Sequence, residues 1–346
     1  ERSRGLGDVY KRQPMNPTLK LKETFRLIGI TVALIVLVLL SMMIGPTYIP
    51  LSEVIAYLIH PSESANQFTL EVLRLPRITL AILAGTAFGI SGLLLQNVLK
   101  NPIASPDIIG VTGGASLSAV FFITFFSSLS IHWLPVFAVS GGAIAMFILL
   151  SFQIKRTIRP STLIIIGIAL QTLFIALVQG LMLTAKQLSA SKAYTWLVGS
   201  LYGGTFQDAT ILLIVLLCMV PLLALIIPRM KVAALDDAIG IGLGLNLTQT
   251  RLIQIIISTV LVSVAISFVG NIGFVGLIAP HIAKTLIKQS TFKQVLMSAL
   301  IGAISILVAD FVGRTLFLPK EIPAGVFIAS FSAPFFIYLL LTVKKF

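Results

Sequence analysis

The stretch RLPRITLAILAGTAFGISGLLLQNVLK, residues 74–100, decides the fold of this chain. Its apolar part, residues 78–98, carries no charged side chain and has the length that an α-helix needs to cross a bilayer, which is about 20 residues. Small residues recur within it, as in GTAFGISG at 85–92, and they let membrane helices approach closely. The stretch predicts a membrane-spanning helix in a tightly packed bundle.

Composition extends this interpretation to the whole chain. Of its 346 residues, 57% are hydrophobic and only 11% are charged, whereas a soluble domain carries roughly 25% charged residues. The net charge is +13, but the basic residues are scattered between apolar segments, which is typical of membrane topology rather than of a nucleic-acid-binding patch. The single cysteine, Cys218, excludes a disulfide framework. We therefore expect an all-α polytopic membrane protein.

Ten apolar segments are candidates for membrane spans, and the eighth is too short for a full straight crossing. The first fourteen residues, ERSRGLGDVYKRQP, are polar and carry no helical period, so we interpret 1–14 as a non-native extension. Residues 15–346 then form a single transmembrane domain. The ten segments lie at 27–44, 78–98, 108–126, 134–152, 163–183, 209–227, 252–269, 277–287, 295–312 and 325–343.

The distribution of lysine and arginine orients these segments. With an even number of spans and both termini in the cytoplasm, most basic residues fall in cytoplasmic loops, as membrane insertion favours. Arg74, Arg77 and Arg314 are exceptions, because this orientation places them on the outer face. Two interpretations stay open. The arginines bind lipid headgroups or pair locally with Glu71, or they form a docking site for an acidic partner through forked bonds to carboxylates.

The polar loop PRMKVAALDDAIGIGLGLNLTQTR, residues 228–251, falls on the cytoplasmic side in this orientation. Within it, residues 232–241 form a short amphipathic piece. Asp236 and Asp237 would lie near the start of a short helix, where negative charge is favourable. The piece is either a surface connector or a helix that docks into a groove of a cytosolic protein.

Motifs for ATP binding and catalysis are absent from the sequence. There is no GxxxxGK[ST] loop. His60 and His132 fall in outer loops and His281 has no nearby partner in the sequence, so no catalytic, metal or cofactor site is expected. Asp310 is the only carboxylate well inside an expected span, which argues against a proton-driven carrier. A sodium-driven carrier would not need such a carboxylate, because it can use backbone carbonyls.

Polar residues in the second and fifth spans are candidates for lining a translocation pathway, because polar groups in a span usually face the protein interior or a water-filled cavity. Hydrogen bonds that pack one helix on another are the alternative for each residue. The candidates are Ser91, Gly92, Gln96 and Asn97 in the second span and Gln171 and Thr172 in the fifth.

Five stretches together resemble one known family. On these motifs the chain is similar to the FecCD-type permeases, the membrane subunits of ATP-binding-cassette (ABC) importers for iron-siderophores, haem and cobalamin. The resemblance covers nearly the whole chain and implies a type II ABC importer permease fold of ten helices. Lys100 and Lys284 stand where the family usually has arginine, which keeps the charge. The stretches are RLPRITLAILAGTAFGISGLLLQNVLKNPIASPDIIGVTGGA (74–115), TWLVGSL (195–201), GNIGFVGLIAPHIAKTL (270–286), LVADFVGR (307–314) and EIPAGVFIASFSAPFFIYLL (321–340).

The resemblance also implies roles for particular residues. In similar proteins, arginines at the positions of Arg74, Arg77 and Arg314 meet glutamates of an extracytoplasmic substrate-binding protein. The loop at 228–251 matches the family's coupling segment, which rests on a cytosolic ATPase. The coupling residues expected here are Leu235, Asp236, Asp237, Ala238, Gly240 and Gly242.

The function implied by the resemblance is import of iron(III)-siderophore across a bacterial cytoplasmic membrane, driven by ATP hydrolysis on separate subunits. The implied partners are a second permease subunit, identical or different, two cytosolic ATPases and the binding protein, with no cofactor and no nucleic acid. Cobalamin or haem import is the alternative within the family. An ion-coupled secondary transporter that acts alone is the alternative from another class.

Overall fold

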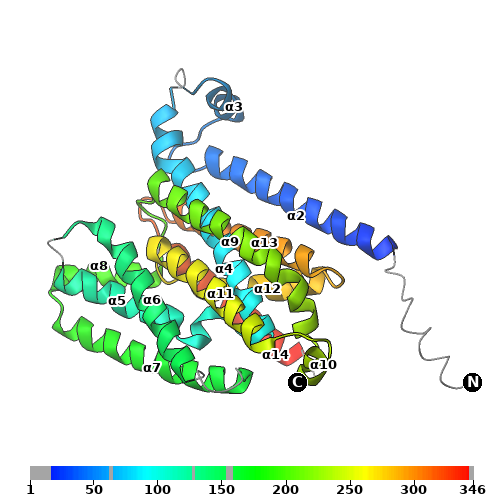
Figure 1. Cartoon of the computed structure of the whole chain (residues 1–346). Coiled ribbons are helices and arrows are strands. Elements are labelled where there is room, and N and C mark those ends of the chain that lie inside the picture. Colours follow the sequence, from blue (N-terminus) through cyan, green and yellow to red (C-terminus); the bar gives the residue numbers. More distant parts are fainter. Residues whose placement is uncertain (1–16, 62–64, 127–128, 153–158, 343–346) are drawn as a thin grey trace, which may run out of the picture.

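The computed structural model describes residues 17–61, 65–126, 129–152 and 159–342. Within these ranges the chain is helical and contains no strand. The expected extension at 1–14 lies outside the described residues. Each of the ten expected apolar segments coincides with a helix (Figure 1), which confirms the prediction of an all-α protein. The ten helices are α2 (Pro17–Met43), α4 (Leu75–Val98), α5 (Val111–Phe125), α6 (Leu134–Ser151), α7 (Pro160–Thr184), α9 (Phe206–Ala233), α11 (Leu247–Val269), α12 (Val275–Leu286), α13 (Thr291–Thr315) and α14 (Ala324–Thr342).

Within the described ranges, seven helices are long and apolar enough to cross a membrane, and the described apolar parts of α5, α12 and α14 are shorter. Short elements connect these helices. They are α3 (Leu51–Ile59), the π-helical turn η2 (Thr69–Arg74), the 3₁₀ turns η3 (Pro106–Ile109) and η4 (Ile131–Trp133), α8 (Gln187–Val198) and α10 (Asp237–Gly242).

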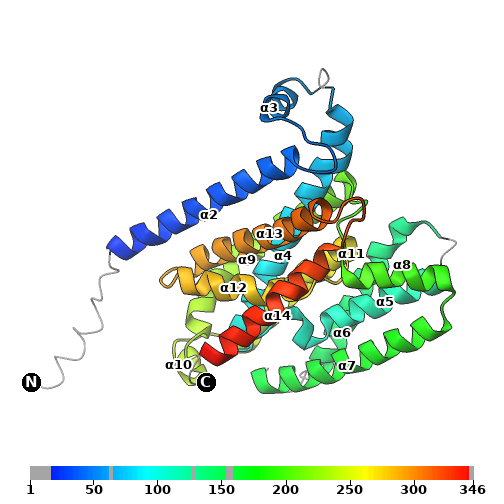
Figure 2. The ribbon, with the colours of Figure 1, turned by 180° about the vertical axis from the view of Figure 1, so that it is seen from behind.

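Helix α4 is the centre of the bundle. It contacts α9, α11, α12 and α13, and 78% of the most apolar part of its span is buried. Helices α5, α6 and α7 form a second group that packs on α11 through α6 and, to a smaller extent, α5 (Figure 1). Figure 2 shows α14 on the side of the bundle opposite α9. Helix α2 lies along the edge against α13, with only 17% of its apolar part buried.

The connection after α4 turns back toward the middle of that helix. A Cβ built on Gly276, at the start of α12, would lie 2.9 Å from Pro106 Cδ and 3.3 Å from the carbonyl oxygen of Phe88, which is near the middle of α4. Helix α12 and the turn that leads into α5 therefore both pack near the middle of α4. This arrangement explains why the eighth expected span is short, as the sequence predicted.

Glycines let the central helices touch backbone to backbone. A Cβ on Gly85 would lie 2.3 Å from the carbonyl oxygen of Gly302 in α13, and a Cβ on Gly92 would lie 1.7 Å from the carbonyl oxygen of Gly276 in α12. Real side chains do not approach a backbone oxygen so closely. The prediction of a tightly packed bundle is therefore confirmed at both contacts of α4.

Candidate functional site

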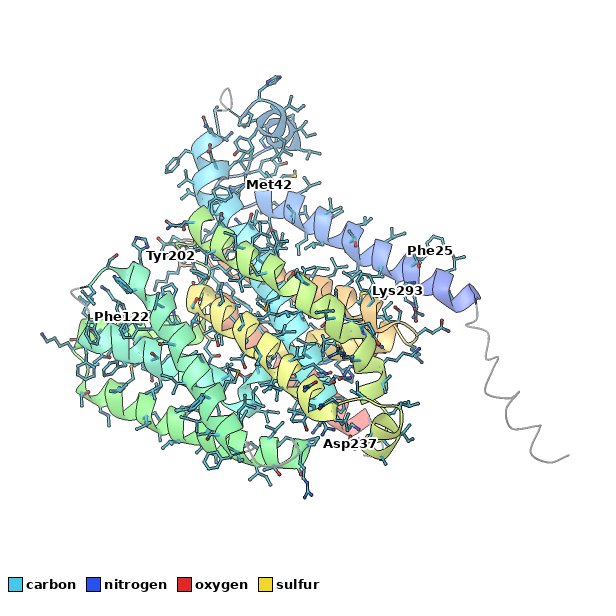
Figure 3. All side chains as sticks on the ribbon, viewed as in Figure 1. Phe25, Met42, Phe122, Tyr202, Asp237 and Lys293 are labelled. Carbon is cyan, nitrogen blue, oxygen red and sulfur yellow. The ribbon has the colours of Figure 1, made fainter. Side chains whose placement is uncertain are left out.

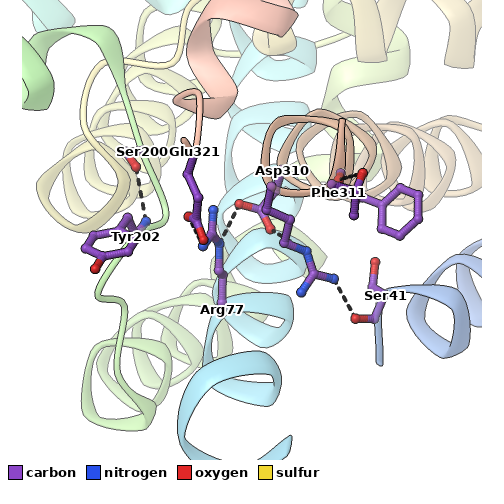
Figure 4. A network of polar contacts seen from close by, with 9 residues as sticks. Ser41, Arg77, Ser200, Tyr202, Asp310, Phe311 and Glu321 are labelled. Atoms are coloured by element: carbon purple, nitrogen blue, oxygen red, sulfur yellow. Dashed lines mark hydrogen bonds and ion pairs between the residues drawn. The ribbon is translucent and has the colours of Figure 1, made fainter. Parts of the chain in front are cut away.

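An arginine cluster joins α4, α13 and the segment before α14 at one end of the bundle. We use this name for Arg74, Arg77, Asp310, Arg314 and Glu321. Arg77 Nε donates to Asp310 Oδ1 and Arg77 Nη1 donates to Glu321 Oε2, each at 2.7 Å (Figure 4). Arg314 Nε lies 3.7 Å from Asp310 Oδ2. The side chain of Asp310 is 1% exposed, whereas Arg77 and Glu321 are 11% and 29% exposed. The pair of Arg77 and Glu321 is thus the solvent-facing edge of the cluster.

The other two arginines point inward, to the end of α2. Arg74 donates to the carbonyl oxygens of Met42 and Thr47, and Arg314 donates to the carbonyl oxygen of Ser41. Both side chains are buried. The last carbonyls of a helix have no partner within it and carry partial negative charge, so two cations stabilise this terminus. Glu71, the local partner considered from the sequence, instead accepts from Gln67 at 2.9 Å.

In this conformation, therefore, only Arg77 of the three candidate docking arginines contributes to a partly exposed ion pair. The docking role of all three stays a prediction. Sequence reasoning missed Asp310 and Glu321 as partners of Arg77. The only local signal was the spacing of Asp310 and Arg314, which lie four residues apart on one helix.

The segment 228–251 contains a short helix, α10 (Asp237–Gly242), as its pattern predicted, but the expected bounds were wrong, because 228–233 end α9 and 247–251 begin α11. Asp236 is the N-cap residue and accepts from the backbone N–H of Ala238 at 2.9 Å. Gly240 is buried, and the space around Gly242 is open. Large apolar side chains outside the membrane spans are exposed here, which is typical of a surface that another protein covers. They are Leu235, Ile239, Ile241 and Leu243.

Asp237 ties α10 to two other parts of the chain. Its Oδ1 accepts from Lys100 Nζ at 2.6 Å. Arg251 Nη2, from the first part of α11, donates to both of its carboxylate oxygens at 2.7 and 2.9 Å. The hydrogen bond from Lys100, followed by that from Arg251, holds the pKa of Asp237 below its ordinary value. The sequence marked Asp237 as a contact with a partner protein, whereas its described bonds are internal.

The two candidate regions lie at opposite ends of the molecule. Figure 3 labels Met42, beside the arginine cluster, at one end and Asp237 at the other. Both regions adjoin α4, because Arg77 is in its first turn and Lys100 lies two positions after its last residue, Val98. Helix α4 is therefore the direct physical link between them.

The candidate pathway residues all make contacts between or within helices in this conformation. Their lining role stays a prediction. Ser91 Oγ is 2.6 Å from Ser258 Oγ, Gln96 donates to the Leu277 carbonyl at 3.2 Å and accepts from Lys284 Nζ at 2.9 Å, and Asn97 donates to the Met230 carbonyl at 3.2 Å. Gln171 accepts from Gly113 N at 3.0 Å, and Thr172 donates to the Ile168 carbonyl at 2.9 Å.

Gly92 gives a sharp test of this packing. We expect Gly92→Ala to lower the free energy of unfolding by about 3 kcal/mol, because the new methyl group would overlap the backbone of Gly276. Gly180→Ala is the matched control, since nothing lies within 4 Å of a Cβ at that helical position. It should stabilise the chain by up to about 1 kcal/mol through helix propensity. Thermal unfolding in detergent measures both, and equal midpoints for the two variants would contradict the packing.

Comparison with known proteins identifies the chain. The model of the FecCD transport family matches residues 33–342. This chain belongs to the FecCD transport family. The resemblance inferred from the sequence motifs is confirmed.

Curated relatives agree with this assignment. The chain is 37% identical over 302 residues to the achromobactin transport system permease protein CbrC of Dickeya dadantii, covering 87% of this chain and 86% of the relative. It is 39% identical over 311 residues to the Fe(3+)-citrate import system permease protein YfmE of Bacillus subtilis, covering 90% and 93%. It is 32% identical to the Fe(3+) dicitrate transport system permease protein FecD of Escherichia coli, covering 92% and 98%.

A solved structure confirms the expected permease fold. A metal-chelate type ABC transporter in an inward-facing conformation superposes with a TM-score of 0.82 at 29% identity, covering 92% of this chain and 100% of that one. PsaBC from Streptococcus pneumoniae, at 19% identity and a TM-score of 0.56, shares the fold. The FecCD chain described here is thus a multi-pass membrane transport protein.

Proposed function

We propose that this FecCD chain is the permease subunit of an ABC importer that carries iron(III)-siderophore into the cytoplasm. The observation that supports this substrate class is the similarity to permeases for achromobactin and ferric citrate along nearly the whole chain. ATP hydrolysis would take place on separate subunits, since the sequence has no phosphate-binding loop. The remaining partners are a second permease subunit and an extracytoplasmic binding protein. Both termini face the cytoplasm.

Uptake of radioactive iron tests the proposal. Cells with and without the gene are offered ⁵⁵Fe bound to citrate, a hydroxamate, a catecholate and a carboxylate siderophore in turn. We expect loss of uptake for one chelate class in the deletion strain. Normal uptake of every chelate, together with lost uptake of labelled cobalamin or haem, would replace the substrate class. Sensitivity to ionophores with no dependence on a partner ATPase would favour a secondary carrier.

Docking of the binding protein is the role that we propose for the arginine cluster. Arg77 is the best placed of the three arginines, because its bond to Glu321 lies at the exposed edge of the cluster. An acidic side chain of the binding protein would replace Glu321 at the guanidinium of Arg77. Arg74 and Arg314 would hold the end of α2 beneath this contact and add positive field that speeds encounter.

Glu321→Gln separates this proposal from a purely internal ion pair. We expect the variant to bind the binding protein more tightly, because Glu321 no longer competes for Arg77. The gain should be about threefold, since an exposed ion pair contributes little energy. Surface plasmon resonance on the importer in nanodiscs measures the affinity. Glu53→Gln is the control, since Glu53 bonds to Asn66 rather than to an arginine of the cluster. Unchanged or weaker binding by Glu321→Gln would contradict the proposed replacement of Glu321 by an acidic side chain of the binding protein.

A further inference from the structure

A pocket lined mainly by polar residues lies between three helix ends, separate from the arginine cluster and from α10. Its volume is about 550 Å³, and it is lined by the first part of α2, the last part of α9 and the start of α13. Figure 3 labels Lys293, at the start of α13, beside the part of α2 that carries Phe25. No residue of the arginine cluster or of α10 itself is in the lining, whereas Pro228 and Lys231, at the end of α9, belong to the segment 228–251.

The position of the pocket corresponds to the headgroup level of a bilayer. Glu23, Lys231 and Thr291 lie near the ends of the three spans that meet here. Large apolar side chains, including Phe25 and Phe292, are exposed beside it. Exposed apolar surface on a membrane span meets lipid tails, and polar side chains at its end meet headgroups. The pocket therefore opens where a lipid would place its polar part.

Two residues in the pocket lining, Glu23 and Gln289, carry buried acceptor oxygens that lack donors within the described residues. Glu23 is 4% exposed, and its Oε1 accepts from the backbone N–H groups of Lys288 and Gln289 at 2.8 and 2.9 Å. Glu23 Oε2 and Gln289 Oε1 are buried and have no hydrogen-bond partner within the described part of the chain. Both residues line the pocket. A buried carboxylate oxygen left unsatisfied is costly, so these two acceptors suit a ligand ammonium group with N–H donors.

Other residues of the lining suit an anion. Lys231 and Lys293 contribute positive charge to the lining. The pocket also includes Ser290, Thr291 and Phe292, which form the N-terminus of α13. First-turn N–H groups have no partner within their helix and carry partial positive charge, so they bind phosphate well. The pocket thus combines groups that suit a phosphate with groups that suit an ammonium.

We propose that this pocket binds the headgroup of phosphatidylethanolamine. The primary ammonium would donate to Glu23 and Gln289, and the phosphate would accept from Lys231 and the first N–H groups of α13, while Lys293, whose Nζ donates to Thr24 Oγ1 at 2.9 Å, adds positive charge nearby. Phosphatidylcholine has no N–H donor for Glu23, and phosphatidylglycerol has no cation. A bound lipid would fasten α2, which is otherwise poorly buried, to α9 and α13.

Native mass spectrometry of the full chain in detergent tests the preference. The protein is given equal amounts of phosphatidylethanolamine, phosphatidylcholine and phosphatidylglycerol, and the retained lipid is counted. We expect phosphatidylethanolamine to be retained about tenfold more than either competitor, which is the effect of one charge-assisted hydrogen bond. Equal retention of phosphatidylethanolamine and phosphatidylcholine would overturn the proposal, as would a preference for phosphatidylglycerol.

Two variants and a control assign the effect to the pocket. Glu23→Gln keeps an acceptor for the N–H groups of Lys288 and Gln289 but turns its amide NH₂ toward the ammonium, so the preference should disappear. Lys231→Gln should weaken retention of phosphatidylethanolamine and phosphatidylglycerol alike. Arg229→Gln removes an exposed cation that does not line the pocket and should leave lipid retention unchanged. A preserved preference in Glu23→Gln, or equal losses in Lys231→Gln and Arg229→Gln, would place the lipid elsewhere.

Discussion

Replacement of Asp310 by asparagine is expected to lower the free energy of unfolding by about 3 kcal/mol or more. Asp310 is 1% exposed and lies between Arg77 and Arg314. Asparagine retains an oxygen that accepts from Arg77 but removes the negative charge. Arg314 then stays buried with no carboxylate near its guanidinium group in the described cluster, because Glu321 bonds to Arg77. An uncompensated buried cation is among the costliest single changes in a protein.

Unfolding midpoints of the purified chain in a fixed detergent measure this effect. Asp208→Asn is a suitable control, because Asp208 belongs to an exposed capping box at the start of α9 and its replacement should cost at most about 1 kcal/mol. The double variant Asp310→Asn with Arg314→Met should recover part of the loss, since it removes the charge left behind. Equal midpoints for Asp310→Asn and Asp208→Asn would contradict the role assigned to the cluster.

The helices were predictable from the sequence because each span must satisfy its own backbone hydrogen bonds in lipid, so a long apolar run has few alternatives to a helix. The short eighth span was predictable because its apolar segment, 277–287, is too short for a full straight crossing. The reason why this span is short could not be predicted, because it depends on the contacts of Gly276 with Pro106 and with Phe88 at the middle of α4. Such contacts involve residues far apart in the chain, and hydropathy carries no information about them.

The arginine cluster shows the same limit more strongly. Charge counting drew attention to Arg74, Arg77 and Arg314 because they depart from the usual distribution of basic residues. It could not distinguish an arginine that faces a partner from one that caps the end of α2. That distinction depends on pairings such as Arg77 with Asp310, which are separated by 233 positions in the chain. Asp237, which the sequence predicted as a coupling residue, was singled out for its place near the start of a short helix, while its internal partners Lys100 and Arg251 were not foreseen.

Replacement of Asp237 by asparagine is expected to reduce transport at least about tenfold while ATP hydrolysis by the assembled importer continues. The expectation rests on the proposed function. Asp237 is the residue of α10 that holds both Lys100, at the end of α4, and Arg251, in α11. Movement of α10 by an ATPase would reach these two helices through its carboxylate. Loss of the two charge-assisted bonds, which solvent screens because the Asp237 side chain is 44% exposed, would let α10 move without these two partners.

The lowered pKa of Asp237 determines the pH range in which this experiment can be interpreted. Its pKa is lowered first by the bond from Lys100. A carboxyl group whose pKa is lowered by folding adds stability above its ordinary pKa, and that stability is lost only as the pH falls through the lowered value. The carboxylate therefore stays ionised between about pH 5 and 8. In this window transport by the unaltered chain should not depend on the titration of Asp237, so the asparagine variant can be compared at a single pH.

Asp236→Asn is the matched control for Asp237→Asn, because asparagine caps a helix as well as aspartate does and Asp236 bonds only to the backbone N–H of Ala238 in the described contacts. It should transport at nearly the normal rate. Asp237→Glu keeps the charge on a longer side chain and should restore part of the transport lost in Asp237→Asn. The measurement is the ratio of substrate transported to ATP hydrolysed in proteoliposomes. If Asp236→Asn lowers this ratio as much as Asp237→Asn does, α10 acts only as a contact surface for the ATPase, and the internal link through Asp237 carries no movement.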